Sequence, residues 1–256
     1  MARPGKGNIG RNRLDMTGFT INPRLDATEL AASFARHGRL QLRDFLAGDA
    51  AERLHANLRA REDWRQVFNA GEKVMEIDRA GQASLPPEKR RELDNSIHAA
   101  ARYGFQYRYE TIRVPDDAAS RQESDDPVAA LVSWLSQDEA RDFLRAVTGA
   151  DDIAFADGQA TAYSPGDFLT AHDDAVEGKN RRAAYVFGLT PKWRTEWGGL
   201  LLFHDGEGNV ERGFAPALNT LNLFRVPSLH SVSEVTRAAG FRRYSVTGWL
   251  RTGSPG

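Results

Sequence analysis

The segment His172-Asp173-Asp174 places a histidine directly before two carboxylates, residue types that bind metal ions and transfer protons. Along an extended strand, residues i and i+2 point to the same face, so His172 and Asp174 can reach one point while Asp173 faces away. One imidazole nitrogen and one carboxylate oxygen are part of the two-histidine, one-carboxylate set that binds iron(II) and leaves coordination positions open. The spacing therefore indicates two candidate ligands of a metal site.

The pair alone is weak support, because six histidines and 35 acidic residues among 256 give about one such spacing by chance. A histidine at a strand end beside a polar turn is the simpler explanation of the pair. A third candidate ligand, His230, opens the segment HSVSEV. A jelly-roll brings strands that are distant in sequence side by side, so His230 can complete the set.

A candidate anion-binding residue lies in RYSVTGWL, where Arg243, Ser245 and Thr247 share one face of a strand. An arginine on the inner wall of a barrel needs an anionic partner, because an unpaired buried charge is costly. That partner is either a carboxylate of the protein or the carboxylate of a small ligand. An open iron centre with a fixed arginine suits 2-oxoglutarate, whose oxo-acid end chelates the metal while its far carboxylate pairs with the guanidinium.

The composition is that of an ordinary globular protein, with 41% hydrophobic and 27% charged residues. The absence of cysteine excludes disulfides, thiolate nucleophiles, zinc–thiolate sites and iron–sulfur clusters. Because 34 basic and 35 acidic residues nearly cancel, no overall field attracts nucleic acid or an anionic membrane. With neither an apolar span nor a secretory h-region, we expect a cytoplasmic protein with no nucleic-acid and no membrane partner.

The first part of the chain is expected to be largely helical. Capping residues mark the predicted helices, which run from Asp26 with Glu29 to Gly38, from Asp49 with Glu52, from Asp126-Pro127, and from Ser136 with Glu139 to Gly149. RLQLRDF and FQYRYETIRV alternate like strands. The segment 71–105 mixes a proline break with helix formers, and we expect it to be mobile or lid-like.

From about residue 153 the chain changes to short segments rich in β-branched and aromatic residues, which predict an antiparallel sandwich or barrel. These segments are IAFADGQATAY, RRAAYVFGL, GGLLLF, ALNTLNLFRV, HSVSEV and RRYSVTGWL. The expected fold is mainly β with flanking α-helices: a double-stranded β-helix (jelly-roll) core at 151–252, preceded by helices at 21–150 that pack on its major sheet. We expect one domain over 21–256 and a basic, disordered tail over 1–20.

The chain resembles the iron(II)- and 2-oxoglutarate-dependent dioxygenases, and more narrowly the prolyl hydroxylases of the EGL-nine and ribosomal-protein type. The resemblance runs from Tyr163 to Trp249 and is an ordered set: AYSPGDFLTAHDD, RRAAYVFGLTPKW, the glycine pair of WGGLLLF, HSVSEV and RRYSVTGW. The segments HDDAVEGKNRR, HSVSEV and RRYSVTGW look closest to the ribosomal-protein prolyl hydroxylases. As a set, these segments are far more specific than the histidine–aspartate pair.

The resemblance implies that His172, Asp174 and His230 bind iron(II), and that Arg243 binds the distal carboxylate of 2-oxoglutarate. It places Tyr163 in the same pocket, so Tyr163 and Arg243 are the catalytic and co-substrate-binding candidates beside the metal. The implied reaction couples oxidative decarboxylation of 2-oxoglutarate, to succinate and carbon dioxide, with hydroxylation of a substrate by O2. Ascorbate is a further candidate cofactor.

Two departures from the family pattern limit what the resemblance implies. The family often has a tyrosine before the Leu of the LTPKW-like segment, where it helps to bind the distal carboxylate, but this chain has Gly188 there. Tyr185, Asn222 or a water are candidates to replace it, and Thr247 shares the face of Arg243. Eukaryotic ribosomal-protein hydroxylases also carry a second jelly-roll after the catalytic one, whereas this sequence ends soon after RYSVTGWL, so we do not carry over a ribosomal substrate.

We therefore expect a dioxygenase that hydroxylates a prolyl residue of a protein or peptide. Two alternatives stay open: a hydroxylase of a free amino acid or other small metabolite, and a cupin-like protein that binds metal or 2-oxoglutarate without turnover. A nucleic-acid demethylase of the same superfamily is disfavoured by the balanced charge and by Trp249, which stands where a second arginine would be expected after Arg243.

The remaining histidines are expected to be structural. His204-Asp205 is the other histidine–acid pair, but adjacent residues face opposite sides of a strand and DGEGN follows, so we expect a hairpin turn. The other three lie in helical segments as surface or packing residues: His37, His55 and His98.

Other conspicuous residues also have simple structural interpretations. Asp173 is expected to be a turn former at the outer surface or substrate entrance, and Trp193 and Trp197 are expected to pack in the core, with an aromatic wall near the substrate as the alternative. The chain has no G-x-S-x-G, Walker A or H-E-x-x-H motif, so serine hydrolase, P-loop and zincin chemistry have no support.

Overall fold

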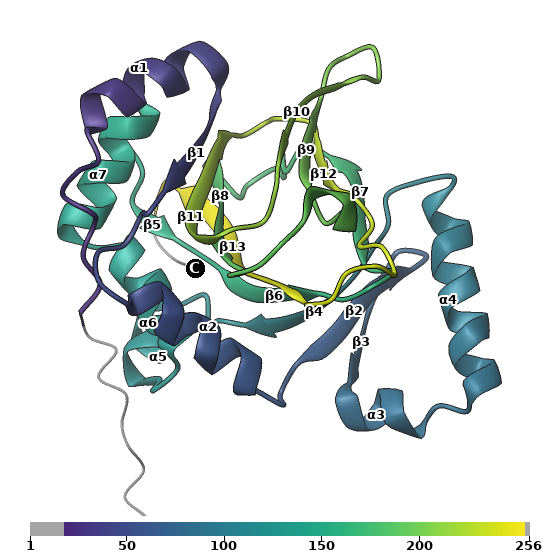
Figure 1. Ribbon diagram of the computed structural model, residues 1–256. Helices are drawn as coiled ribbons and strands as arrows, with labels where there is room; N and C mark the ends of the chain where they lie inside the picture. Colours follow the sequence, from purple (N-terminus) through teal and green to yellow (C-terminus); the bar gives the residue numbers. More distant parts are fainter. Residues whose placement is uncertain (1–17, 254–256) are drawn as a thin grey trace, which may run out of the picture.

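The computed structural model describes residues 18–253 (Figure 1). Its centre is an antiparallel β-structure that curls nearly into a barrel, with helices around the outside. This confirms the predicted mainly β, jelly-roll-like fold with flanking helices. Residues 1–17 of the predicted tail lie outside the described residues. Phe19, in the remainder of the predicted tail, packs on Trp134 with ring centroids 5.6 Å apart.

The helices form where the sequence supplies caps. The carboxylate of Asp26 accepts hydrogen bonds from the backbone N–H groups of Thr28 and Glu29, and Gly38 ends the same helix in the left-handed conformation with φ 66°. The helices are α1 (Ala27–His37), α2 (Ala50–Ala60), α3 (Arg79–Ser84), α4 (Pro87–Ala101), α5 (Ala118–Glu123), α6 (Pro127–Leu135) and α7 (Asp138–Thr148), with a 3₁₀ turn, η1, at Thr195–Trp197. Within residues 18–253, no helix has the length and apolar character needed to cross a membrane.

The strands pair antiparallel throughout the described chain, in the order β1-β11-β8-β13-β6-β4-β7-β12-β9-β10. Strand β2 joins this path by pairing with β4 and with β3, and β5 pairs with β13. The strands are β1 (Arg39–Arg43), β2 (Arg65–Ala70), β3 (Lys73–Asp78), β4 (Tyr107–Arg113), β5 (Phe155–Ala156), β6 (Gln159–Tyr163), β7 (Phe168–His172), β8 (Arg181–Leu189), β9 (Leu201–His204), β10 (Val210–Phe214), β11 (Leu218–Arg225), β12 (His230–Val232) and β13 (Arg243–Arg251).

The alternation of side chains along β13 separates the two sides of the major sheet. Tyr244, Val246 and Leu250 face the helices and belong to the main hydrophobic core, which also contains residues of α2, α6 and α7. Arg243 and Thr247 have the opposite parity and line the interior of the barrel. The helices therefore support the sheet from outside, while its inner face is left for the site.

One expectation about the first half of the chain is wrong in detail. Ser136 does not begin α7. It ends α6, where its hydroxyl donates to the carbonyl of Val132 and accepts from the backbone N–H of Ala156. The segment 71–105 forms β3, α3 and α4, and the β2–β3 hairpin was not predicted because β3 is largely exposed and lacks an apolar alternation.

Helix α4 packs on the sheet far from α2, α6 and α7, which contribute to the main hydrophobic core (Figure 1). Its Ile97 packs in a small cluster with Phe68 and Phe168. Arg108 of β4 extends the anchor by ion pairs with Asp94 of α4, at 2.6 Å, and with Asp167, at 2.8 Å. Asp167 lies in the turn between β6 and β7, so this network joins α4 to the strands that carry Tyr163 and His172.

Replacing Arg108 by methionine should strongly destabilise the fold. The change leaves the carboxylate of Asp167, only 4% exposed, without its cationic partner, and breaking a buried pair in this way costs about 3–5 kcal/mol. Urea unfolding followed by tryptophan fluorescence measures the loss.

Arg113→Met is the matched control on the same strand, since its pair with Glu76 is largely exposed and such pairs contribute about 0–1 kcal/mol. Equal losses in the two variants would show that the buried network does not stabilise the fold.

Candidate active site

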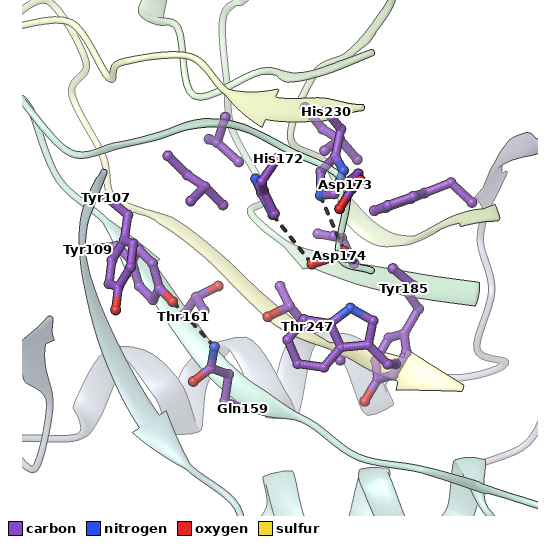
Figure 2. A pocket seen from close by; sticks show the side chains of 18 of the residues that line it. Tyr107, Tyr109, Gln159, Thr161, His172, Asp173, Asp174, Tyr185, His230 and Thr247 are labelled. Carbon is purple, nitrogen blue, oxygen red and sulfur yellow. Dashed lines mark hydrogen bonds and ion pairs between the residues drawn. The ribbon is translucent and has the colours of Figure 1, made fainter. Parts of the chain in front are cut away.

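A cavity of about 390 Å³ opens inside the barrel (Figure 2). Its walls come from β4, β6, β7, β8, β12 and β13, so it lies where the two halves of the curled sheet meet. Most of the lining side chains are apolar or aromatic. The histidine, aspartate and arginine residues that line it lie in two places: His172, Asp173, Asp174, Arg181 and His230 at one, and Arg243 at the other.

The structure brings the three predicted metal ligands together. His172 on β7 and His230 on β12 lie directly opposite each other in the antiparallel ladder, and Asp174 follows the end of β7. The Nε2 atom of each imidazole is 3.4 Å from a carboxylate oxygen of Asp174, and one ligand atom from each residue lies within 4.8 Å of the others. Figure 2 shows the three side chains converging from these two strands.

The backbone fixes which imidazole nitrogen faces the cluster. Nδ1 of His172 is 3.0 Å from the carbonyl of Thr170, and Nδ1 of His230 is 2.7 Å from the carbonyl of Ser228. A carbonyl accepts only, so Nδ1 carries the proton and Nε2 keeps its lone pair. Both histidines therefore present the nitrogen that a metal ion requires, oriented by a hydrogen bond from the other nitrogen.

The electrostatics of the cluster favour the ligand protonation states. Burial, with a smaller contribution from His172, lowers the pKa of His230 to about 4, so its imidazole is neutral near pH 7. Burial works to raise the pKa of Asp174, but its contacts with His172 and His230 outweigh burial and hold that pKa below its ordinary value. A neutral His230 beside an ionised Asp174 is the pair of forms that binds a divalent ion.

Arg181 holds Asp174 in an uncommon backbone conformation. Asp174 has φ 64°, in the left-handed region that non-glycine residues seldom adopt. The guanidinium of Arg181 donates to the carbonyl of Asp174 at 2.9 Å and stacks on the Trp249 ring, with its central carbon 3.5 Å from the ring centroid. The hydrogen bond and the stack therefore hold Asp174 with its carboxylate between His172 and His230.

Arg243 lies at another part of the cavity and is 4% exposed. Its guanidinium carbon is 4.7 Å from the centroid of the Tyr163 ring, and its Nη1 atom has no hydrogen-bond partner. Among residues 18–253, no carboxylate forms an ion pair with Arg243. Of the two partners considered from the sequence, a protein carboxylate is therefore not observed in the described residues. Burial lowers the pKa of Arg243, with Tyr163 opposing, which reflects the cost of holding this charge without a counter-ion.

The other predicted pocket residues divide into two groups. Tyr163 and Thr247 line the cavity, as expected. Asn222 does not line it: its amide nitrogen donates to the carbonyl of Val186 and its oxygen accepts from Gln41. Tyr185 borders the cavity, but its side chain belongs to the helix-covered core and its hydroxyl donates to the carbonyl of Asp157. Neither residue has a free polar group for a co-substrate.

Gly188 lies on β8 directly opposite Ser245 of β13. It has the same parity as Ala184 and Val186, which line the cavity, so a side chain here would project from the inner face of the sheet. A Cβ atom at this position would be 2.3 Å from the carbonyl oxygen of Ala217. The backbone around Ala217 therefore excludes the tyrosine that the family often carries here.

Several cavity residues were missed by the sequence prediction. The most prominent are Phe105, Tyr107 and Tyr109, which form a wall of aromatic rings on and just before β4. Their alternate spacing in FQYRYETIRV was visible as a strand pattern, but nothing in the sequence showed that this strand borders the site. Asp173 lies at the cavity as well, and its carboxylate accepts from the backbone N–H of Ala175, as in a turn.

The remaining candidates have structural contacts. Asp205 forms the predicted hairpin turn by accepting from the backbone N–H groups of Glu207 and Asn209, and His204 contacts the hydroxyl of Ser231. Trp193 and Trp197 pack edge to face with ring centroids 5.5 Å apart and are not part of the cavity lining. His55 and His98 each place Nδ1 at a backbone carbonyl.

Part of the chain is similar to the 2-oxoglutarate- and iron(II)-dependent oxygenases. Residues 158–251, which include every predicted metal ligand, match the model of the 2OG-Fe(II) oxygenase superfamily. The chain is similar to the prolyl 3-hydroxylase OGFOD1 of Mus musculus, with 32% identity over 142 residues, covering 53% of this chain and 25% of that protein. The corresponding protein of Xenopus laevis is 34% identical over 142 residues, covering 53% and 27%.

The match thus spans about a quarter of the length of these curated relatives. Solved structures show the same fold at low identity. A prolyl-4-hydroxylase of Pseudomonas putida superposes with a TM-score of 0.56 at 19% identity, over 90% of this chain and 100% of that chain. A prolyl hydroxylase of Trichoplax adhaerens, in complex with a peptide fragment of the hypoxia-inducible-factor oxygen degradation domain, gives 0.56 at 16% identity, over 88% and 89%. The resemblance found in the sequence is confirmed.

Replacing Asp174 by alanine should strongly weaken specific binding of a divalent metal ion, because it removes one of three converging ligands and the one that carries negative charge. Isothermal titration with Mn²⁺ under anaerobic conditions measures the affinity. Asp173→Ala is the matched control, since it removes the neighbouring carboxylate, which bonds to Ala175 rather than to the histidines. Unchanged metal affinity in Asp174→Ala would mean that the ligand set is wrong.

Gly188→Ala should destabilise the protein by about 1–3 kcal/mol, because its Cβ atom overlaps a backbone carbonyl that must shift. Thermal and urea unfolding measure the change. Gly206→Ala is the control, since a Cβ atom there meets no heavy atom within 4 Å. If both variants unfold like the wild type, the approach of Ala217 does not restrict position 188.

Proposed function

We propose that this protein is an iron(II)- and 2-oxoglutarate-dependent dioxygenase that hydroxylates a prolyl residue of a protein or peptide. The observation that carries the proposal is the presence, in one cavity, of three converging metal-type ligands and a buried guanidinium without a carboxylate partner. The superfamily match supports the cofactors, and the prolyl hydroxylases among the similar proteins support the substrate class.

In this proposal, iron(II) is held by Nε2 of His172, Nε2 of His230 and a carboxylate oxygen of Asp174. Three protein ligands leave positions open for 2-oxoglutarate and O2, which a fourth protein ligand would block. When bound together, these groups supply the oxidising chemistry, as cofactors do in enzymes of this kind. The carbonyls of Thr170 and Ser228 keep the histidines in the ligand tautomer, and Arg181 keeps Asp174 in place.

Arg243 would bind the far carboxylate of 2-oxoglutarate. Its unpartnered Nη1 atom offers the donor, and the face of Tyr163 confines the guanidinium from one side. A charge-assisted pair formed away from water is among the stronger hydrogen-bonded contacts in proteins. The arginine would thus orient the co-substrate so that its oxo-acid end reaches the metal ligands.

The apolar walls around these two anchoring points would keep water from the reacting atoms. Leu201, Val232 and Phe224 line the cavity together with the aromatic residues of β4. Excluding water strengthens the electrostatic contacts inside the site and protects reactive species from side reactions. The protein's contribution is therefore binding, orientation and exclusion of water.

The direct test is an anaerobic titration of the purified protein with iron(II) and 2-oxoglutarate, following the visible charge-transfer band of the chelated complex. A band in the wild type that is lost in His172→Ala supports the proposed site. No band in folded, iron-loaded protein would overturn the dioxygenase and leave a protein that binds metal or small acids without turnover.

Arg243→Met should weaken 2-oxoglutarate binding by about 2–5 kcal/mol, because a buried charged partner is lost. The concentration of 2-oxoglutarate needed to develop half of the band measures this change. Arg237→Met removes an exposed arginine that does not line the cavity and should leave the titration unchanged. An unchanged requirement in Arg243→Met would show that this arginine does not bind the co-substrate.

A further inference from the structure

Four aromatic rings form a continuous row along one wall of the cavity. Ring centroids are 5.6 Å apart between Phe105 and Tyr107, 5.4 Å between Tyr107 and Tyr109, and 5.1 Å between Tyr109 and Tyr163. Phe105 lies 5.3 Å from the ring of His172, and Arg243 lies over Tyr163 at the other end. The row therefore connects the metal ligands to the proposed co-substrate arginine.

The β4 strand explains why the row exists. Side chains alternate along a strand, so Tyr107 and Tyr109 face the cavity while Arg108 and Glu110 face the buried ion-pair network on the opposite side. Arg108 and Glu110 are buried and paired there, which fixes the register and the orientation of the strand. In Figure 2 the rings of Tyr107 and Tyr109 lie against each other on this wall.

Exposure changes along the row. Tyr163, beside Arg243, is 3% exposed, whereas Phe105 at the other end is 51% exposed. Val176, on the loop after the metal-binding carboxylate, also lines the cavity and is 51% exposed. The inner end of the row thus belongs to the co-substrate region, while Phe105 and Tyr107 lead from the metal ligands to the cavity mouth.

The chemistry of the outer rings selects a class of ligand. They present π faces and, in Phe105, no polar group, so they favour flat, apolar, weakly hydrated surfaces over charged ones. Exposed aromatic side chains that continue a binding cavity mark a surface that a ligand covers. Segments in the polyproline II conformation bind such aromatic-lined surfaces at low entropic cost, because their shape is already formed.

From this row we infer that Phe105 and Tyr107 bind the residues that flank the target in a polypeptide, and that the preferred substrate segment is proline-rich and in the polyproline II conformation. The inference rests on the proposed function and adds its substrate class. A free amino acid held at the metal would leave the outward-facing part of this surface uncovered. A polypeptide continues from the target residue across these rings to the outside.

The test uses anaerobic protein loaded with iron(II) and 2-oxoglutarate, and an oligo-L-proline of about ten residues, long enough to form polyproline II turns. Isothermal titration should show binding of this probe, and much weaker binding of free L-proline and of a glycine–serine peptide of equal length. Phe105→Ala and Tyr107→Ala should each weaken oligoproline binding about fivefold or more, since each removes an aromatic contact. Tyr107→Phe keeps the ring and should bind like the wild type.

Tyr103→Ala is the matched control, because Tyr103 is 89% exposed, lies close to Phe105 in sequence and does not line the cavity. It should not change the affinity, and thermal unfolding confirms that every variant is folded. Wild-type protein that gives the charge-transfer band but does not bind oligoproline would overturn the inference and leave the proposed function standing. So would equal binding of free L-proline, or unchanged binding in Phe105→Ala and Tyr107→Ala. Absence of the band in wild-type protein would instead overturn the proposed function itself.

Discussion

The site depends on the antiparallel pairing of β7 with β12, which sets His172 directly opposite His230. Side chains alternate along a strand, so a slip of one residue would turn one histidine to the other face of the sheet and separate the ligands. The bonds from Nδ1 to the carbonyls of Thr170 and Ser228 then hold each ring with Nε2 toward Asp174. One register thus determines both the position and the chemical form of the ligands.

The second constraint is the cost of burying charge. Arg243 is held inside the barrel with an unpartnered donor, whereas the buried Arg108 is paired with Asp167. A protein rarely keeps an uncompensated buried charge, because desolvation makes it expensive. Arg108 therefore stabilises the fold, whereas the free donor of Arg243 is available to a ligand.

The matched family segment and the aromatic wall come from different parts of the chain. Residues 158–251 contain the three candidate metal ligands, Tyr163 and Arg243, whereas Phe105, Tyr107 and Tyr109 precede them and belong to β4 and the turn before it. The segment that matches the superfamily model therefore contains the residues to which the oxidising chemistry is assigned in the proposed function. The surface at the mouth comes from Phe105 and Tyr107, which follow α4, and α4 contacts the sheet through Ile97 and Asp94.

Several features were determined by the sequence alone, because they depend on local spacing. Caps such as Asp26 and Gly38 gave the helix ends, short segments rich in β-branched and aromatic residues gave the strands of the β region, and the order of the motif segments pointed to the candidate ligands and to Arg243. Local spacing can also misplace a boundary: Ser136 has the chemistry of a helix start, yet its hydroxyl is used to close the preceding helix.

Only the tertiary structure decided which face of each strand is the inside of the barrel and which strands meet. That choice placed Tyr185 in the helix-covered core, satisfied Asn222 on Gln41 and Val186, and brought the tyrosines of β4 to the cavity. It also closed position 188 to any side chain, through a carbonyl of a separate segment. Periodicity shows which residues share a face, but the partner of that face is set by packing between segments far apart in the chain.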